Sequence, residues 1–349
     1  MRTWLFLAAL LLLAGPVPAE EKLFPDFDEL KPPVLFPKGA PIAVDQYGNY
    51  CLDGKPRFLL GAQIPNKIVG SVLPTRGYPD SLKWLYEQVI DYRAAQRVGF
   101  DTLSYFASEQ WVKEIDRSYQ SFLFDDETRE ALGKIRREIG LPLQIDFTCA
   151  PWSHGLFLEN REKYKDRIPL SAYNSRGSMS DSNHWTPYCL ADSAGRELYR
   201  NMWRSGAREF KESGGQGLMY ELFNEPAYHD PCPANRKNFV AYLKEQYRTL
   251  DAVNRRWDSN YRSFDEIGQF KDRTDNPGLF VDWSKFMERE FLNLCREGMS
   301  IIREIDPTAR FCVQPPGADN FRTLPKNHVN LFEINRYCSF VSTSSGSGT

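Results

Sequence analysis

Short apolar runs alternate with longer amphipathic segments along most of the chain. Apolar runs of strand length predict six strands, at residues 57–63, 100–106, 141–148, 217–224, 310–314 and 336–342. Segments in which apolar residues recur every three or four positions predict helices at 82–98, 126–139, 193–212, 235–250 and 283–305. Before them, residues 42–56 predict a short hairpin that turns at Asp53-Gly54. This alternation of strands and helices indicates a parallel sheet covered by crossover helices.

The fourth apolar run, Leu218–Phe223, is apolar at nearly every position, which is typical of a strand covered on both faces. The expected fold class is α/β, with the architecture of a (β/α)8 TIM barrel. A closed barrel of this type has eight strands. About six βα units are visible before the Ser- and Gly-rich residues 345–349, so we expect the barrel to be C-terminally incomplete. An open sheet is the alternative.

The N-terminus has the pattern of a signal peptide. Arg2 precedes the apolar run Trp4–Ala14, and the small residues Val17-Pro18-Ala19 follow. A membrane span needs ~20 apolar residues, so an anchor is the weaker interpretation. We expect cleavage after Ala19 and a secreted or periplasmic protein. Residues 20–40 are acidic and proline-rich and predict an extended lead-in, and residues 41–349 predict one catalytic domain.

Charge and cysteine content narrow the class of partner and cofactor. The formal net charge of −2 argues against nucleic acid as a partner. The 14% of aromatic residues suits a sugar-binding cleft and a filled core equally well. None of the seven cysteines has zinc-ligand spacing, so we expect neither a metal nor a cofactor. A disulfide between Cys189 and Cys232 is conceivable, and packing in the core is the default role of the cysteines.

The main chemical candidate is Glu225. Asn224-Glu225-Pro226 ends the fourth strand, and barrel active sites lie at the carboxyl ends of the strands. A Glu at such a tip can lose solvent against aromatic rings, which keeps it protonated for a general-acid role. Glycoside cleavage needs such an acid and a second carboxylate. Asn224 can bond a sugar hydroxyl. A turn without catalytic meaning is the alternative.

Three stretches resemble known glycosidases. Leu218–Pro226 resembles the fourth-strand signature of glycosidase clan A and is closest in wording to family 5. The stretch from Leu250 to Ile267, with Trp257, Tyr261, Ser263 and Phe264, is similar to the "LN..W...Y.SF..I" segment of family 42 β-galactosidases. In this chain Asp251-Ala252-Val253 separates Leu250 from Asn254. Asp53–Phe58 and Gly61–Gln63 resemble the first-strand entry of such enzymes.

The resemblance implies an eight-stranded barrel, retention of anomeric configuration and a nucleophilic Glu on the seventh strand. Glu225 and Asn224 match the acid/base and its neighbouring Asn. The nucleophile has no match, because only six strands are expected in this sequence and the seventh is not among them. Family 42 members often carry a cysteine cluster for zinc, which this sequence does not reproduce.

Six further residues are candidates for binding substrate, and ordinary loop packing is the alternative for each. Trp152 and His154 follow the third strand, where the Trp152 ring would form the floor of a sugar subsite and His154 would bond a hydroxyl. Tyr105 is expected after the second strand, and Trp185 lies in the long segment 155–188. Tyr228 and His229 closely follow Glu225 in the chain.

Two other acidic residues have structural interpretations. Glu221 has the same strand parity as Glu225, and a bare charge inside a barrel is costly. We therefore expect Glu221 to be the buried partner of an Arg, for example Arg57. Glu333 precedes the sixth strand, and we expect it at the surface.

These observations predict an exported retaining glycoside hydrolase that cleaves β-linked sugars in the manner of a β-galactosidase. An endo-acting β-mannanase or β-glucanase of the family 5 type is the second possibility, and a non-catalytic partial barrel is the third. The expected partner is an oligosaccharide or polysaccharide. We expect neither nucleic acid nor, after signal cleavage, a membrane, and the oligomeric state is not predicted.

Overall fold

The structure is a computed structural model, and it describes part of the chain. The described residues are 43–47, 49–52, 54–56, 59, 61–64, 101–106, 112–115, 122–124, 143–147, 189–212, 217–224, 226, 228, 230–270, 276–314, 330–334 and 336–338. The expected signal peptide, the lead-in and the helices expected at 82–98 and 126–139 lie outside them.

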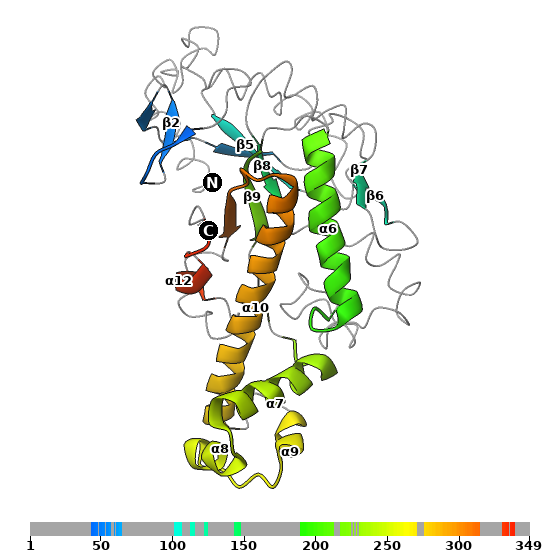
Figure 1. The fold of residues 1–349 in the computed structure, drawn as a ribbon, viewed down its shortest axis with the longest axis vertical. Coiled ribbons are helices and arrows are strands. Elements are labelled where there is room, and N and C mark those ends of the chain that lie inside the picture. Colours follow the sequence, from blue (N-terminus) through cyan, green and yellow to red (C-terminus); the bar gives the residue numbers. More distant parts are fainter. Residues whose placement is uncertain are drawn as a thin grey trace, which may run out of the picture.

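Five parallel strands form the central sheet (Figure 1). They are β4 (Gly61–Ile64), β5 (Thr102–Phe106), β8 (Leu143–Asp146), β9 (Gly217–Asn224) and β10 (Phe311–Gln314). Their order in the sheet is β10-β9-β8-β5-β4, the same as their order along the chain. A doubly wound sheet reverses direction at a switch point, whereas a barrel adds each strand to the same edge. The sheet is therefore an arc of a barrel, as expected.

Two smaller antiparallel sheets accompany the arc. The first joins β1 (Ala43–Val44), β2 (Tyr50–Leu52) and β3 (Lys55–Pro56), so the expected hairpin is confirmed and has a third strand. Its turn contains Gly54, whose φ of 71° lies in the left-handed region that glycine tolerates. The second joins β6 (Val112–Ile115) and β7 (Phe122–Phe124). This second hairpin was not predicted from the sequence.

Six helices are described: α6 (Ser193–Glu212), α7 (Pro233–Tyr247), α8 (Leu250–Trp257), α9 (Phe264–Gly268), α10 (Pro277–Ile305) and α12 (Leu331–Ile334). Helices α6 and α10 run side by side along the sheet, and α7, α8 and α9 gather at the far end of α10 (Figure 1). Among the described helices, none combines the length and apolar composition needed to cross a membrane.

Local capping explains where the helices differ from the expected bounds. Helix α10 begins at Pro277 and not at residue 283, because the Asn276 side chain accepts a hydrogen bond from the backbone N–H of Leu279. The helix expected over 235–250 ends at Tyr247, since Arg248 takes a positive φ. Thr249 then caps α8.

The start of the sixth expected strand is wrong. Arg336 and Tyr337 form a turn after α12, and residues 339–342 lie outside the described residues. Glu333 lies in α12, half-buried, and pairs with Arg336 at 3.2 Å across one helical turn. The expectation that Glu333 lies near the surface is thus broadly confirmed, although its surroundings are helical.

Aromatic rings fill the space between β9 and its two covering helices. Phe223 of β9 packs edge-on against Trp203 of α6, with ring centroids 6.0 Å apart, and against Phe291 of α10 at 5.0 Å. Trp203 is fully buried, and a Cβ added to Gly298 of α10 would lie 3.0 Å from its ring. The small residue at 298 therefore lets α10 approach Trp203 closely.

One buried carboxylate joins the helices at the far end of α10. Asp282 accepts hydrogen bonds from the Tyr247 hydroxyl at 2.6 Å and from the Trp257 indole N–H at 2.7 Å. Burial and the bond to Asp282 raise the pKa of Tyr247 to about 12, so its hydroxyl remains a donor at neutral pH. The side chain of Asp282 thus ties α7 and α8 to α10.

Replacing Asp282→Ala should lower the free energy of unfolding by about 2–4 kcal/mol, because it leaves the buried Trp257 N–H without its charged acceptor. Lys285→Ala, an exposed site one turn along α10, should change it by less than about 0.5 kcal/mol. Urea denaturation of both variants checks this, and equal effects would contradict the role given to Asp282.

Candidate active site

The carboxyl ends of the parallel strands meet at one edge of the sheet. Strand β9 reaches this edge at Asn224, and its neighbours β8 and β10 reach it at Asp146 and Gln314. The residues directly after these ends face one another across the mouth of a barrel. Glu225, directly after β9, belongs by chain position to this edge.

A β-bulge interrupts β9 just before the edge. Cys312 of β10 pairs with Glu221 and Gln314 pairs with Asn224, so three steps on β9 match two steps on β10. Leu222 and Phe223, which are adjacent in the chain, are both buried in the main core. An extra residue of this kind shifts the alternation of faces and re-aims the side chains after it. Strand parity alone therefore no longer predicts that Glu221 and Glu225 share a face, and the orientation of Glu225, which lies outside the described residues, stays a prediction.

Glu221 is buried below the bulge, as expected, and accepts a hydrogen bond from the Gln144 amide of β8. Gln144 is in register with Met219, so its side chain reaches Glu221 diagonally. The expected partner, Arg57, lies outside the described residues. This polar contact within the sheet links β8 to β9.

The described residues of the connection after β9 are mostly buried. Pro226, Tyr228, Asp230 and Cys232 all have little exposed surface. The Tyr228 ring packs against Phe291 of α10, with centroids 5.8 Å apart. Burial, with the charge of Asp230 nearby, raises the pKa of Tyr228 well above its ordinary value. The connection is thus packed into the protein on both sides of residue 225.

Asp230 organises the end of this connection. Its carboxylate accepts a hydrogen bond from the Cys232 backbone N–H at 3.2 Å, and its carbonyl accepts one from the Asn235 side chain at 2.8 Å. The Arg236 guanidinium donates to the Pro231 carbonyl at 2.8 Å. These bonds fix the backbone that leads into α7, which begins at Pro233.

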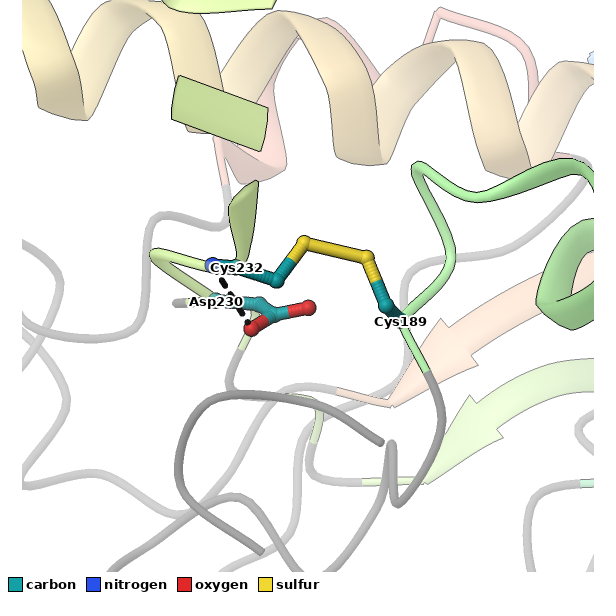
Figure 2. A group of neighbouring side chains, drawn as sticks. All are labelled: Cys189, Asp230 and Cys232. Carbon is teal, nitrogen blue, oxygen red and sulfur yellow. Dashed lines mark hydrogen bonds between the residues drawn. A yellow bond between two sulfur atoms is a disulfide. The ribbon is translucent and has the colours of Figure 1, made fainter. Parts of the chain in front are cut away.

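A disulfide joins Cys189 to Cys232 (Figure 2). Cys189 lies just before α6, and Cys232 is the residue that precedes Pro233 of α7, so the bond links the N-termini of two helices. The two Cα atoms are 6.5 Å apart, and 43 residues separate the two cysteines along the chain. A bond that closes a loop of this length stabilises the fold by about 4 kcal/mol in the chain-entropy description.

The same place can be tested as a metal site. The Cys189 and Cys232 sulfurs and an Asp230 carboxylate oxygen lie within 4.8 Å of one another. A structural zinc site needs four ligands, and its cysteines must be thiolates. Within the described residues no fourth His, Cys, Asp or Glu joins the group, and the sulfurs are bonded to each other. These residues therefore fit a disulfide and not a structural zinc centre.

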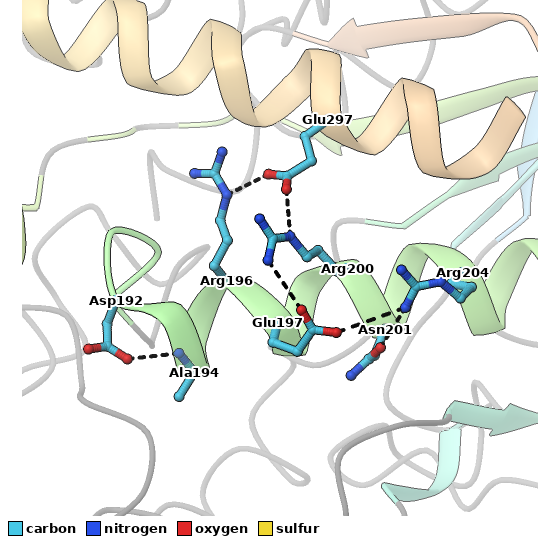
Figure 3. Close-up of polar contacts among 8 residues, drawn as sticks. All are labelled: Asp192, Ala194, Arg196, Glu197, Arg200, Asn201, Arg204 and Glu297. Carbon is cyan, nitrogen blue, oxygen red and sulfur yellow. Dashed lines mark hydrogen bonds and ion pairs between the residues drawn. The ribbon is translucent and has the colours of Figure 1, made fainter. Parts of the chain in front are cut away.

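A charged network holds the start of α6 against α10 (Figure 3). Glu297 of α10 accepts hydrogen bonds from Arg196 and Arg200, one on each carboxylate oxygen. Both arginines lie in the first half of α6, and Asp192 caps the helix by accepting from the Ala194 backbone N–H at 2.9 Å. The helix end that carries Cys189 is thereby fixed by charge as well as by packing.

Most residues proposed to contact substrate lie outside the described residues: Glu225, Trp152, His154, Trp185 and His229. For two others only the backbone is described. Asn224 ends β9. Tyr105 lies within β5 and not after it, so the expected position of Tyr105 is wrong; it is in register with Ile145 of β8 and through it with Tyr220 of β9. Their roles stay predictions.

Asp230 and Asn235, beside the expected site, were not predicted from the sequence. Asp-Pro-Cys-Pro at 230–233 is a turn-forming run, and its Asp was the available signal. The conceivable Cys189–Cys232 bridge is confirmed.

Comparison with known proteins gives both a family and a fold. The family model of glycoside hydrolase family 42, described as beta-galactosidase, matches residues 162–345, just over half of the chain. β-Galactosidase BglY of Alicyclobacillus acidocaldarius is 25% identical over 146 residues, which are 39% of this chain and 21% of that protein. For β-galactosidase bgaB of Geobacillus kaustophilus the identity is 28% over 156 residues, which are 42% of this chain and 23% of that protein.

Solved structures of β-galactosidases resemble the fold. The enzyme from Bacillus circulans sp. alkalophilus superposes with a TM-score of 0.62 and 16% identity, over 84% of this chain and 41% of that one. The enzyme from Marinomonas ef1 gives a TM-score of 0.60 and 18% identity, over 83% and 41%. This chain therefore spans less than half the length of the proteins it matches.

Replacing Glu221→Leu should lower the free energy of unfolding by about 1–3 kcal/mol more than Glu221→Gln, because leucine leaves the Gln144 amide without its acceptor whereas glutamine keeps an acceptor oxygen. Guanidinium denaturation of the two variants, monitored by tryptophan fluorescence, provides the measurement. Equal destabilisation would show that the contact between Gln144 and Glu221 contributes nothing.

Proposed function

Because this chain belongs to glycoside hydrolase family 42, whose family model is described as beta-galactosidase, we propose that it is the acid/base-bearing part of an exported retaining glycosidase that cleaves β-linked galactosides. The resemblance seen in the sequence is thus confirmed at the level of the family. The substrate, the catalytic roles and export belong to the proposal.

One observation carries the proposal. Strand β9, a buried parallel strand inside the matched region, ends at Asn224, at the edge where barrel enzymes keep their active sites, and Glu225 is the next residue in the chain. A carboxyl group placed directly after such a strand is held by the sheet and not by a loose loop. Rigid placement of this kind is what proton transfer to a leaving oxygen requires.

The proposed mechanism is a double displacement. Glu225 donates its proton to the glycosidic oxygen as the aglycone leaves, and a second carboxylate attacks the anomeric carbon. Glu225, now ionised, then removes a proton from the water that hydrolyses the glycosyl–enzyme intermediate. Asn224 orients the sugar by a hydrogen bond to a ring hydroxyl.

The proposed mechanism also needs a second carboxylate, the nucleophile. The family resemblance assigns it to a seventh strand, whereas the sequence predicts six strands in residues 1–349. Hydrolysis is therefore to be measured on the complete product of the gene that encodes this chain. An apolar strand that ends in Glu, corresponding to the seventh strand of a family 42 barrel, is the expected source of the nucleophile.

Five residues are proposed to bind the sugar near Glu225: Trp152, His154, Tyr105, Trp185 and His229. Aromatic rings would stack on the apolar face of galactose and histidines would bond its hydroxyls. An endo-acting mannanase or glucanase of the family 5 type would instead act on polymers. Aryl galactosides, aryl mannosides and β-glucan, tested side by side, separate these substrate classes.

Replacing Glu225→Gln in the complete protein should lower kcat/KM by about 10²- to 10⁴-fold on galactosides with poor leaving groups. Galactosides with good leaving groups, such as dinitrophenyl galactoside, should lose far less at the glycosylation step, because their departure needs little protonation. Steady-state kinetics on a series of aryl galactosides measures both effects. Glu212→Gln, at the exposed end of α6, is the matched control and should leave both unchanged. Undiminished hydrolysis of both substrate kinds by Glu225→Gln would overturn the acid/base assignment.

The proposed export leads to a separate prediction. The protein expressed with its own N-terminus should reach the periplasm or medium and begin at Glu20, since residues 1–19 have the pattern of a cleaved signal peptide. Mass spectrometry of the N-terminal peptide from each cell fraction measures this. A protein that stays in the cytoplasm with residues 1–19 attached would refute export.

A further inference from the structure

The connection that carries Glu225 is held at both of its ends. At one end β9 is hydrogen-bonded to β8 and β10, and Phe223 is locked between α6 and α10. At the other end Cys232 is covalently bonded to Cys189. A short connection fixed at both ends has few conformations to choose from, and Glu225 belongs to this connection by its position in the chain.

At the disulfide end of the connection, the backbone segments pack closely against each other. Gly195, in the first turn of α6, leaves room for the Cys189 carbonyl: a Cβ at this position would lie 2.2 Å from that oxygen. The Asp230 carboxylate lies beside the two sulfurs and bonds to the Cys232 N–H (Figure 2). Asn235 holds the Asp230 carbonyl from the other side. Cys189, Asp230 and Cys232 are all almost completely buried.

We infer that the Cys189–Cys232 disulfide is a positioning device for the proposed acid/base: together with Asp230 it holds the connection after β9 in place. The inference rests on the proposed function, since it gives the bond a role in proton donation. Neither cysteine touches the reacting atoms. Each acts through the backbone that leads from Asn224 to Cys232.

The first measurement establishes the bond without reference to activity. The complete protein is unfolded in the presence of iodoacetamide and without reductant. It is then reduced and labelled with N-ethylmaleimide, and the masses of its peptides are measured by mass spectrometry. Cys189 and Cys232 should carry only the second label, whereas the cysteines outside the disulfide, Cys51, Cys295, Cys312 and Cys338, should carry the first. First label on Cys189 and Cys232, with stoichiometric zinc by plasma mass spectrometry, would overturn the disulfide and leave the proposed function intact.

The second measurement separates positioning from mere stability. In the double variant Cys189→Ala/Cys232→Ala, kcat/KM should fall about 10- to 100-fold on galactosides with poor leaving groups, because a misplaced acid donates its proton badly. Galactosides with good leaving groups should lose less than about 3-fold, and KM should change little. The melting temperature should also fall, by about 5 °C.

Cys338→Ala is the matched control, because Cys338 is a partly buried free thiol that packs beside the main core. It should change neither the leaving-group dependence nor the basic limb of the pH profile. Dithiothreitol, whose two sulfurs close into a ring as the protein disulfide opens to two thiols, should convert the wild type to the behaviour of the double variant. The basic limb of kcat/KM should shift in both cases.

The remaining outcomes are distinct. Equal losses on good and poor leaving groups would show that the bond only stabilises the fold, which overturns the positioning role. An unchanged double variant would overturn it as well. A protein that carries the bond but hydrolyses no galactoside would overturn the proposed function, and the positioning role with it.

Discussion

Burial of β9 on both faces is the constraint on which the rest of the structure depends. Its backbone is paired to a strand on each side, Phe223 is held by rings of α6 and α10, and Met219 packs with Cys312 of β10. A strand held in this way cannot slide, since a shift of one residue would exchange its two faces. The bulge between Glu221 and Asn224 is therefore a stable feature of the strand, and it comes immediately before Glu225, the proposed acid/base, in the chain.

Helix α10 connects this strand to the remainder of the described protein. Near its C-terminal half, Glu297 receives two arginines from α6, and Gly298 admits the Trp203 ring. Near its N-terminal end, Asp282 receives the hydroxyl of Tyr247 and the indole of Trp257. One long helix thus supports both the barrel arc and the helices α7 to α9, and buried or half-buried acidic groups make the contacts at each end.

The disulfide beside the proposed site has the same mechanical effect that a metal bound by cysteines would have. Both cross-link segments distant in sequence, but a zinc centre needs thiolates and a complete ligand set, whereas a disulfide needs an oxidising compartment. The proposed export would supply such a compartment. The disulfide between Cys189 and Cys232 and the expected signal peptide therefore support the same hypothesis, that the protein acts outside the cytoplasm.

Sequence periodicity by itself determined the elements whose patterns are long and clean. Strand β9 and helix α6 have the bounds expected from the sequence, and β5, β8 and β10 fall inside their expected ranges. The family also emerged from a local motif, since the stretch from Leu250 to Ile267 that resembles family 42 is contiguous in the sequence. Glu225 remains a candidate supported by its motif and its place after β9.

Tertiary structure alone decided the features that join distant residues. The bulge in β9 is visible only through its pairing with β10, because an extra residue leaves the apolar pattern of the strand unchanged. The Cys189–Cys232 bond, the Asp282 contacts and the Gln144–Glu221 contact bring together positions 25 to 77 residues apart. No local period encodes such pairings, since they depend on which helix faces reach the sheet and how closely the backbones can pack.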